Sequence, residues 1–236
     1  MLARLVRKLE KYAELPDPAR RALEQITLVE RHLAPREDVF RIGDAPKHLN
    51  LILDGWACRY VHLEDGRRLI SALLLPGDLS DLRMTLLQSA DHSVGAITPL
   101  HVAIIQPDRL NELAQSFPIV ERALLWNSLV DESIARAWIT NIGQRAASER
   151  LAHLFCEIFT RLETVGLVEG DSCSFPLTQE QLADSIGIST VHVNRSLMDL
   201  RSAGLIALKD KVLTIIDRRA LESFAMFDPT YLHFER

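Results

Sequence analysis

Hydrophobic and polar residues follow a strand-like spacing in one part of the chain and a helical spacing in the rest. Between about residues 27 and 105, short apolar runs alternate with turns, and glycines recur every 11 or 12 residues, at Gly43, Gly55, Gly66 and Gly77. Short runs with such regular turns predict β-strands packed as a sandwich or barrel. Asp54-Gly55 and Asp65-Gly66 are dipeptides typical of hairpin turns, so we expect each to join two paired strands.

Residues 2–26 predict two short helices divided by Leu15-Pro16-Asp17-Pro18. Residues 118–142 predict one long helix of about 37 Å, with Pro118 in its first turn and Gly143 at its end. Along this helix, apolar and asparagine residues recur at intervals of three and four residues in turn, which is the spacing of a coiled-coil seam. We expect a dimer seam formed by Val120, Ala123, Asn127, Val130, Ile134, Ala137 and Asn141. The alternative is a helix that lies flat on the strands through Leu125 and Leu129, and both faces could serve.

The segment 177–206 predicts two short helices joined by a tight turn. Thr178 and Gln181 have the spacing of a capping box at the start of a helix. Gly187 tolerates the positive φ of a turn, and Ser189 is a good N-cap for the second helix. The apolar face of that helix is formed by Val193, Leu197 and Leu200, and Gly204 is placed to end it.

Polar and small residues at the start of the second helix lie mostly off its apolar face: Thr190, Val191, His192, Asn194 and Arg195. In a helix-turn-helix, these positions meet base edges in the major groove of DNA. Arginine can grip guanine, asparagine can pair with adenine, and valine can touch a thymine methyl group. The alternative is an ordinary helical hairpin with solvated polar residues.

Two β-prone runs, residues 205–208 and 212–216, follow the second helix and are joined by Lys209-Asp210-Lys211. They predict a hairpin that would make the unit a winged helix. Lys209 and Lys211 at its tip are placed to contact phosphates.

The motifs LTQEQLADSIGIS (177–189), VHVNRSLMDLRSAGLI (191–206) and RAASERLAHLFCEIF (145–159) resemble the cyclic-AMP receptor and fumarate-nitrate regulator (Crp/Fnr) superfamily of bacterial transcription regulators. The resemblance implies an α+β fold with an N-terminal antiparallel β-roll of the double-stranded jelly-roll type, a long dimerisation helix and a C-terminal winged helix-turn-helix. The expected domains are 1–117 (a cyclic-nucleotide-binding-like sensor with N-terminal helices), 118–143 (dimerisation helix and hinge) and 144–236 (DNA binding).

By position in that family, Thr190, Val191 and Arg195 would read bases. Thr178, Gln179 and Ser189 would touch phosphates. Many members carry a glutamate where this chain has Val191, which leaves its preferred half-site open.

The segments that match the cyclic-AMP site of the family are 76–81 and 90–94. Asp78 could accept hydrogen bonds from a ribose, but no arginine stands where the phosphate would be held, and Asp91 would repel an anion. An unpaired phosphate charge in a partly buried pocket is costly. We therefore expect some effector other than cyclic AMP, if any, in a candidate pocket of Asp78, Ser80, Asp81, His92 and Ser93.

Composition narrows the partners and cofactors. The 236 residues carry a formal charge of −5, so DNA must be met by a local basic patch. No apolar run would span a membrane, and the first 15 residues lack the uncharged core of a signal peptide, so we expect a cytoplasmic protein. Cys58, Cys156 and Cys173 suit reduced thiols. Cys156 is either a redox switch or a buried, inert thiol.

We expect no cofactor and no catalysis. The N-terminal cysteine cluster of the iron–sulfur sensors is absent, and His92 and His101 have no ligand partner at a diagnostic spacing. No nucleophile motif or glycine-rich phosphate loop is present. The leading hypothesis is a homodimeric regulator on a palindromic promoter site in double-stranded DNA, which contacts RNA polymerase if it is an activator. The alternative is a sensor or interaction module of the same fold that no longer binds DNA.

Overall fold

The computed structural model describes residues 2–26, 29–82 and 87–234. Its helices are α1 (Ala3–Leu9), α2 (Asp17–Glu24), α3 (Pro107–Ser116), α4 (Pro118–Gln144), α5 (Ala147–Thr164), α6 (Gln179–Ile186), α7 (Thr190–Ser202), α8 (Arg218–Ala225) and the 3-10 helix η2 (Pro229–Leu232). Its strands are β1 (Val29–Leu33), β2 (Asp38–Phe40), β3 (Leu49–Asp54), β4 (Ala57–His62), β5 (Arg68–Leu74), β6 (Ser93–Ala96), β7 (Leu100–Ile105), β8 (Val168–Glu169), β9 (Ser172–Ser174), β10 (Ile206–Lys209) and β11 (Val212–Ile215). None of the described helices is both long and apolar enough to cross a membrane.

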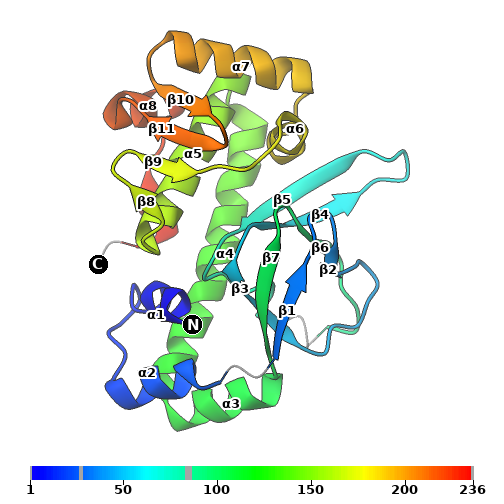
Figure 1. The fold of residues 1–236 in the computed structure, drawn as a ribbon, viewed down its shortest axis with the longest axis vertical. Coiled ribbons are helices and arrows are strands. Elements are labelled where there is room, and N and C mark those ends of the chain that lie inside the picture. Colours follow the sequence, from blue (N-terminus) through cyan, green and yellow to red (C-terminus); the bar gives the residue numbers. More distant parts are fainter. Residues whose placement is uncertain (1, 27–28, 83–86, 235–236) are drawn as a thin grey trace.

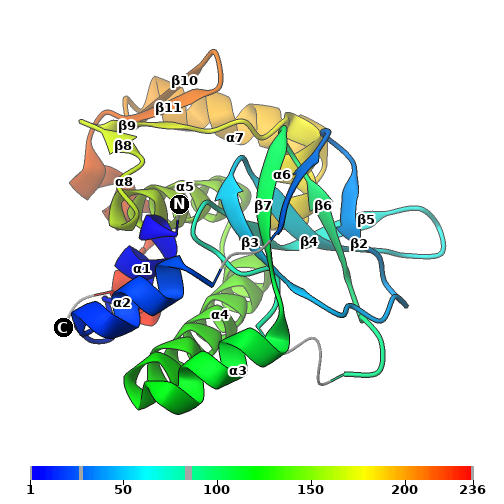
Figure 2. The ribbon, with the colours of Figure 1, turned by 60° about the horizontal axis from the view of Figure 1, so that its bottom comes forward.

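The strands of the first half form two antiparallel sheets, of order β1-β7-β3 and β2-β6-β4-β5. Apolar side chains from both sheets, including Leu33, Ile52, Val94 and Val102, form the core between them. The long helix α4 runs beside this β-roll. Helices α1–α3 lie near one end of α4, and the C-terminal elements lie near its other end (Figures 1 and 2). The α+β fold class is therefore confirmed.

One of the two expected hairpins forms and the other does not. Asp65-Gly66 joins β4 to β5, which pair over their whole length. Asp54-Gly55 was expected to do the same for β3 and β4, and this prediction is wrong, because β3 pairs with β7 whereas β4 pairs with β5 and β6. A Cβ on Gly55 would lie 2.2 Å from the carbonyl oxygen of Pro99. The glycine thus allows a tight turn that passes the chain from one sheet to the other.

The residues expected on the dimer seam of α4 lie inside the protomer. Val120 and Ala123 pack in a cluster with α1, α2 and β3, and Val130 and Ile134 pack in the cluster that contains the core of the C-terminal domain. Asn127 and Asn141 are also buried, and Ala137 is half-buried. The seam prediction is therefore wrong in its residues, since this face of α4 already covers its own chain.

The opposite face of α4 is exposed and has the same heptad spacing. Its members follow one another in steps of four, three, four and three residues: Leu125, Leu129, Glu132, Arg136 and Ile139. Leu129 and Ile139 are 51% and 72% exposed. Both faces of α4 thus alternate in steps of three and four, and only the packing of the other elements distinguishes them.

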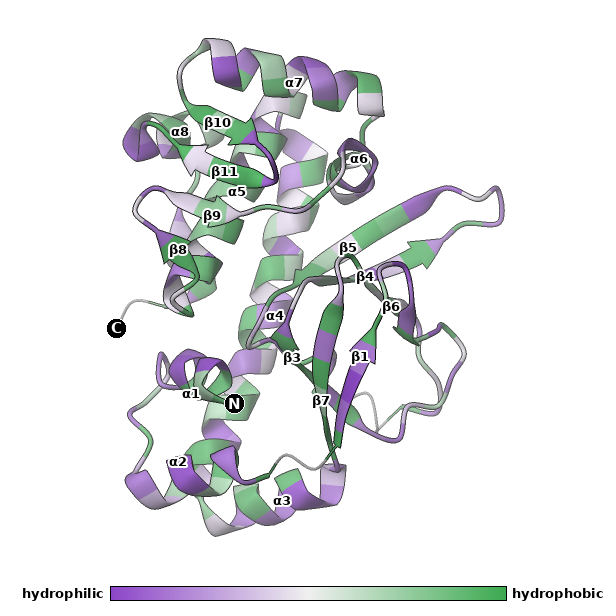
Figure 3. Ribbon diagram, viewed as in Figure 1, coloured by the Kyte–Doolittle hydropathy of each residue, from purple (hydrophilic) through white to green (hydrophobic). Residues whose placement is uncertain are grey.

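The C-terminal elements pack around α5, and their core is continuous with residues of α4 and of the sensor sheet. A four-stranded sheet of order β10-β11-β9-β8 packs with α6, α7 and α8 around an apolar core that includes Phe155, Leu197 and Leu213. Figure 3 shows hydrophobic and hydrophilic residues alternating along α7, which lies at the outer edge of the C-terminal elements.

Candidate nucleic-acid interface

The two helices of the helix-turn-helix are held by the local interactions that their sequence predicts. The backbone N–H of Gln181 donates to Thr178 Oγ1 at 3.2 Å, and the backbone N–H of Thr178 donates to Gln181 Oε1 at 2.9 Å, which is a complete capping box. Gly187 ends α6 with a φ of 68°, a conformation that suits glycine. Ser189 caps α7 by accepting a hydrogen bond from the backbone N–H of His192.

All five residues expected to read bases are exposed on α7: Thr190, Val191, His192, Asn194 and Arg195. Within the described part of the chain, the Arg195 guanidinium has no hydrogen-bond or ion-pair partner. His192 is engaged locally, because its Nδ1 lies 2.8 Å from Ser189 Oγ. The helix therefore presents Arg195 free for an external acceptor, whereas the His192 ring helps to cap the helix start.

The residues expected at phosphates surround this face. Thr178, Gln179 and Ser189 at the two helix starts, and Lys209 and Lys211 in the wing, are all exposed. Asp210 and Lys211 have φ values of 51° and 62° and form the tight turn between β10 and β11. A feature that our interpretation of the sequence missed is Met198, which is 62% exposed on the same face of α7. Its spacing of three residues from Arg195 could have revealed it.

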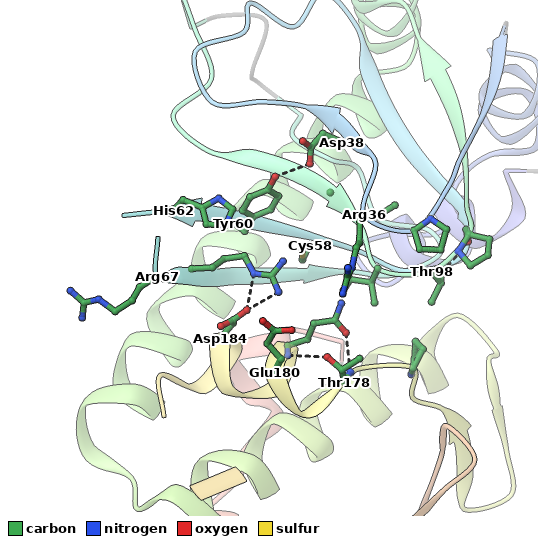
Figure 4. A pocket seen from close by; sticks show the side chains of 18 of the residues that line it. Arg36, Asp38, Cys58, Tyr60, His62, Arg67, Thr98, Thr178, Glu180 and Asp184 are labelled. Carbon is green, nitrogen blue, oxygen red and sulfur yellow. Dashed lines mark hydrogen bonds and ion pairs between the residues drawn. The ribbon is translucent and has the colours of Figure 1, made fainter. Parts of the chain in front are cut away.

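The first helix of the motif docks directly on the sensor sheet. Arg68 of β5 forms an ion pair with Asp184 of α6, with 2.7 Å between Nη2 and Oδ2. The same guanidinium lies 5.9 Å from the centre of the Tyr60 ring. Beside these residues is a cleft of about 780 Å³ between the sheet and α6 (Figure 4), which Thr178 and Lys211 also line. Residues of the sensor sheet and two of the residues expected to contact DNA therefore line the same cleft.

The candidate effector residues are held by separate sets of partners. Ser80 is buried and its backbone N–H donates to the carbonyl of Asn50. Ser93 accepts from the backbone N–H of Ile42 at 3.0 Å. His92 Nδ1 lies 2.7 Å from Asp91 Oδ1. Asp81 is half-buried. Among the described residues, no hydrogen bond joins any two of the Ser80, His92 and Ser93 side chains, and the buried His92 Nε2 has no hydrogen-bond partner.

Asp78 is buried in an ion-pair network that joins three parts of the chain. Its Oδ1 accepts from Lys8 Nζ of α1 at 2.7 Å, and its Oδ2 accepts from Arg161 Nη2 of α5 at 2.8 Å and from the backbone N–H of Leu75. Burial opposes ionisation, but the charges of Lys8 and Arg161 outweigh it and lower the pKa of Asp78 to about 2. The carboxylate is therefore ionised and held by three donors of the protein itself.

The network continues through Arg161 to a second buried carboxylate. Arg161 Nη1 donates to Glu157 Oε1 at 3.2 Å, and Glu157 also accepts from Trp138 Nε1 of α4 and from the Tyr231 hydroxyl of the C-terminal segment. Burial raises the pKa of Glu157, although Arg161 and the hydrogen bonds from Tyr231 and Trp138 oppose this. The sensor domain, α4 and the DNA-binding domain are thus connected by one continuous set of buried polar contacts.

The three cysteines are buried, free thiols. Burial raises the pKa of Cys58, Cys156 and Cys173 to about 12 in each case. Since the thiolate is the reactive form, all three are protonated and unreactive near neutral pH, which favours the interpretation of Cys156 as an inert core residue.

Two family models match the chain. The cyclic nucleotide-binding domain matches residues 30–117, and the Crp-like helix-turn-helix domain matches residues 149–224. A β-roll, a long helix and a capped helix-turn-helix with an exposed second helix define the class of the protein: a DNA-binding regulator with a sensor-type domain.

Relatives with similar sequences extend over most of the chain. Transcriptional activator protein FnrL of Cereibacter sphaeroides is 30% identical over 197 residues, which cover 82% of this chain and 78% of FnrL. Nitrogen fixation regulation protein FixK of Bradyrhizobium diazoefficiens is 26% identical over 194 residues, covering 82% and 81% of the two chains. The chain therefore belongs to the Crp/Fnr superfamily, and it is a DNA-binding transcription regulator of that type.

Solved structures show the same fold. FixK2 from Bradyrhizobium japonicum superposes with a TM-score of 0.73 at 22% identity, covering 83% of this chain and 96% of that one. The c-di-GMP responsive regulator CLP of Xanthomonas campestris superposes with a TM-score of 0.65 at 18% identity, covering 86% and 100% of the two chains.

Proposed function

We propose that this regulator acts as a homodimer and recognises a palindromic site in double-stranded DNA through α7. The observation that carries the proposal is the exposed face of α7. It bears Arg195 without a partner inside the described part of the chain, between helix starts and a wing that also expose polar groups. Arg195 is the main base reader, with Thr190, Val191 and Asn194 beside it. Thr178, Gln179, Ser189, Lys209 and Lys211 hold the backbone of the duplex.

The dimer forms through the exposed stripe of α4, defined by Leu125, Leu129, Glu132, Arg136 and Ile139. Its heptad spacing allows two copies of α4 to pack along a common two-fold axis. A two-fold dimer places its two recognition helices against two half-sites one helical turn of DNA apart.

Cyclic AMP does not control this protein. The carboxylate of Asp78 is buried and already accepts from Lys8, Arg161 and a backbone N–H, so a ribose would have to displace these donors. The buried thiols do not support a thiol-based redox signal. An effector, if one exists, would have to act elsewhere on the β-roll.

The experiment is the selection of random double-stranded DNA by the purified protein, without added ligand and at near-physiological salt. We expect a palindrome with two half-sites. Arg195→Ala should cost about 1–3 kcal/mol and relax the preference at one base per half-site. Arg109→Ala, on an exposed part of α3, is the matched control and should change neither the affinity for DNA nor the base preference. An Arg195→Ala variant with an unchanged preference would refute the role of Arg195, and a clear tightening by cyclic AMP would refute the proposal on the effector.

A further inference from the structure

The exposed face of α7 carries two large apolar side chains that the protomer does not cover. Val191 is 72% exposed and Met198 is 62% exposed. They lie seven positions apart, so they point in directions that differ by only about 20°. Arg195 projects about 40° to one side of Val191 and Asn194 about 60° to the other. All four line one shallow depression of about 490 Å³.

The core of the domain does not account for these two residues. The buried positions of α7 are Val193, Ser196, Leu197 and Leu200, which face the other side of the helix. Single exposed apolar residues are common on protein surfaces. Here, however, two of them are aligned along the face that carries Arg195, which has no partner in the described part of the chain, so one external surface can contact all three side chains.

The major groove of DNA offers a matching surface. The only apolar group on a base edge there is the C5 methyl of thymine, and the most frequent partner of arginine is the O6/N7 edge of guanine. A row of apolar, cationic and apolar side chains therefore fits a guanine with a thymine methyl group on either side of it along the groove. Those methyl groups can belong to either strand, since both strands expose them in the major groove.

We infer that Val191 and Met198 each contact a thymine methyl group beside the guanine read by Arg195, and that Met198 is a specificity-determining residue. The inference rests on the proposed function, namely that α7 enters the major groove. It adds that each half-site contains a G·C pair with an A·T pair on both sides. It also places the end of the reading surface two helical turns after Val191.

The test uses uracil, which differs from thymine only by the missing methyl group. Each thymine of the selected palindrome is replaced by uracil in both half-sites, and the affinity of the full-length protein is measured at fixed salt. Burying one methyl-sized group contributes about 0.8 kcal/mol, which corresponds to about a fourfold change per contact. We expect such a loss at two positions of each half-site and none at the other thymines.

Protein variants assign each methyl group to its side chain. Met198→Ala should abolish the uracil effect at one of the two positions only, and Val191→Ala at the other only. Both residues are mostly exposed, so neither change disturbs the core. Ile216→Ala removes another exposed apolar side chain, outside α7, and should leave both uracil effects intact.

The outcomes separate the two levels of the argument. Enrichment of a palindrome whose uracil forms all bind equally well would overturn the inference and leave the proposed function standing. Uracil effects that persist in both alanine variants would also overturn it, because they would arise from the DNA alone. Failure to enrich any site would overturn the proposed function and this inference together.

Discussion

Replacing Asp78 with asparagine tests how strongly the buried network holds the domains together. The substitution keeps the shape of the side chain but removes the charge that faces Lys8 and Arg161, which are only 5% and 8% exposed. An amide has one oxygen to offer two cations, so one of them is left buried without its acceptor. Removing one partner of a buried ion pair typically costs about 3–5 kcal/mol.

The pKa of Asp78 gives an independent figure for the same interaction. The difference between its ordinary value of 3.8 and about 2 in the fold corresponds to about 2.5 kcal/mol of stabilisation of the ionised form. We therefore expect Asp78→Asn to lower the free energy of unfolding at pH 7 by roughly 2.5–5 kcal/mol.

Urea-induced unfolding of both proteins over a range of pH checks the magnitude and the sign. Because the pKa of Asp78 is lowered in the fold, its charge stabilises the native state above pH 3.8, and this stabilisation is lost as the pH falls towards 2. The difference in unfolding free energy between the two proteins should accordingly narrow by about 1 kcal/mol between pH 7 and pH 3.

The matched control is Glu112→Gln, which breaks an exposed ion pair with Arg109 on α3. Exposed pairs contribute only about 0–1 kcal/mol, so this variant should unfold almost as the wild type does. If Asp78→Asn were as stable as Glu112→Gln at pH 7, the network would not be a source of stability, and the reasoning from burial and charge would be refuted.

Three further predictions concern the α4 stripe, a buried histidine and the thiols. Leu129→Asp should convert the dimer into folded monomers in sedimentation velocity, whereas Ile42→Asp, at another exposed position, should not; a Leu129→Asp variant that stays dimeric would contradict the assignment of the stripe. Burial and the charge of Arg145 lower the pKa of His153 to about 4. Between pH 6.5 and pH 4 this histidine is therefore protonated in the unfolded state but neutral in the folded state, and the fold loses stability as the pH drops. The free energy of unfolding of the wild type should fall by up to about 3 kcal/mol over this range, and that of His153→Phe should fall measurably less in urea-induced unfolding. Parallel pH profiles of the two proteins would argue against this role of His153. Cys156 should react with a maleimide only after unfolding, and rapid labelling of the native protein at pH 7 would show that the thiol is not sealed in the core.

The parts of the fold that could be predicted from the sequence are those held by neighbours along the chain. The capping box of Thr178 and Gln181 and the turn at Gly187 need no distant partner, and the structure confirms them. The wing between β10 and β11 is similarly local. This is why the DNA-binding unit is recognisable from its sequence, although the exposed Met198 of α7 was missed.

The errors came from features that depend on distant contacts. Both faces of α4 alternate in steps of three and four, so only the packing of α1 and the two core clusters shows that Val120 and Ile134 point inward. An Asp-Gly turn is equally compatible with pairing within a sheet and with a crossing between sheets, and the carbonyl of Pro99 against Gly55 decides this case. Asp78 was interpreted as a ligand-binding group because its partners lie 70 and 83 residues away along the chain.

The reach of Arg161 into the sensor limits how far the two halves of this regulator can be exchanged with those of its relatives. A recombinant protein joined at the hinge after α4 would keep Asp78 and Lys8 but take residue 161 from another parent. Unless that parent supplied a cation of similar length at this position, the chimera would bury a carboxylate that lacks one of its two cationic partners. The two domains are therefore coupled by the ion pair of Arg161 with Asp78 as well as by the hinge. A working chimera would need both residues of this pair from the same parent.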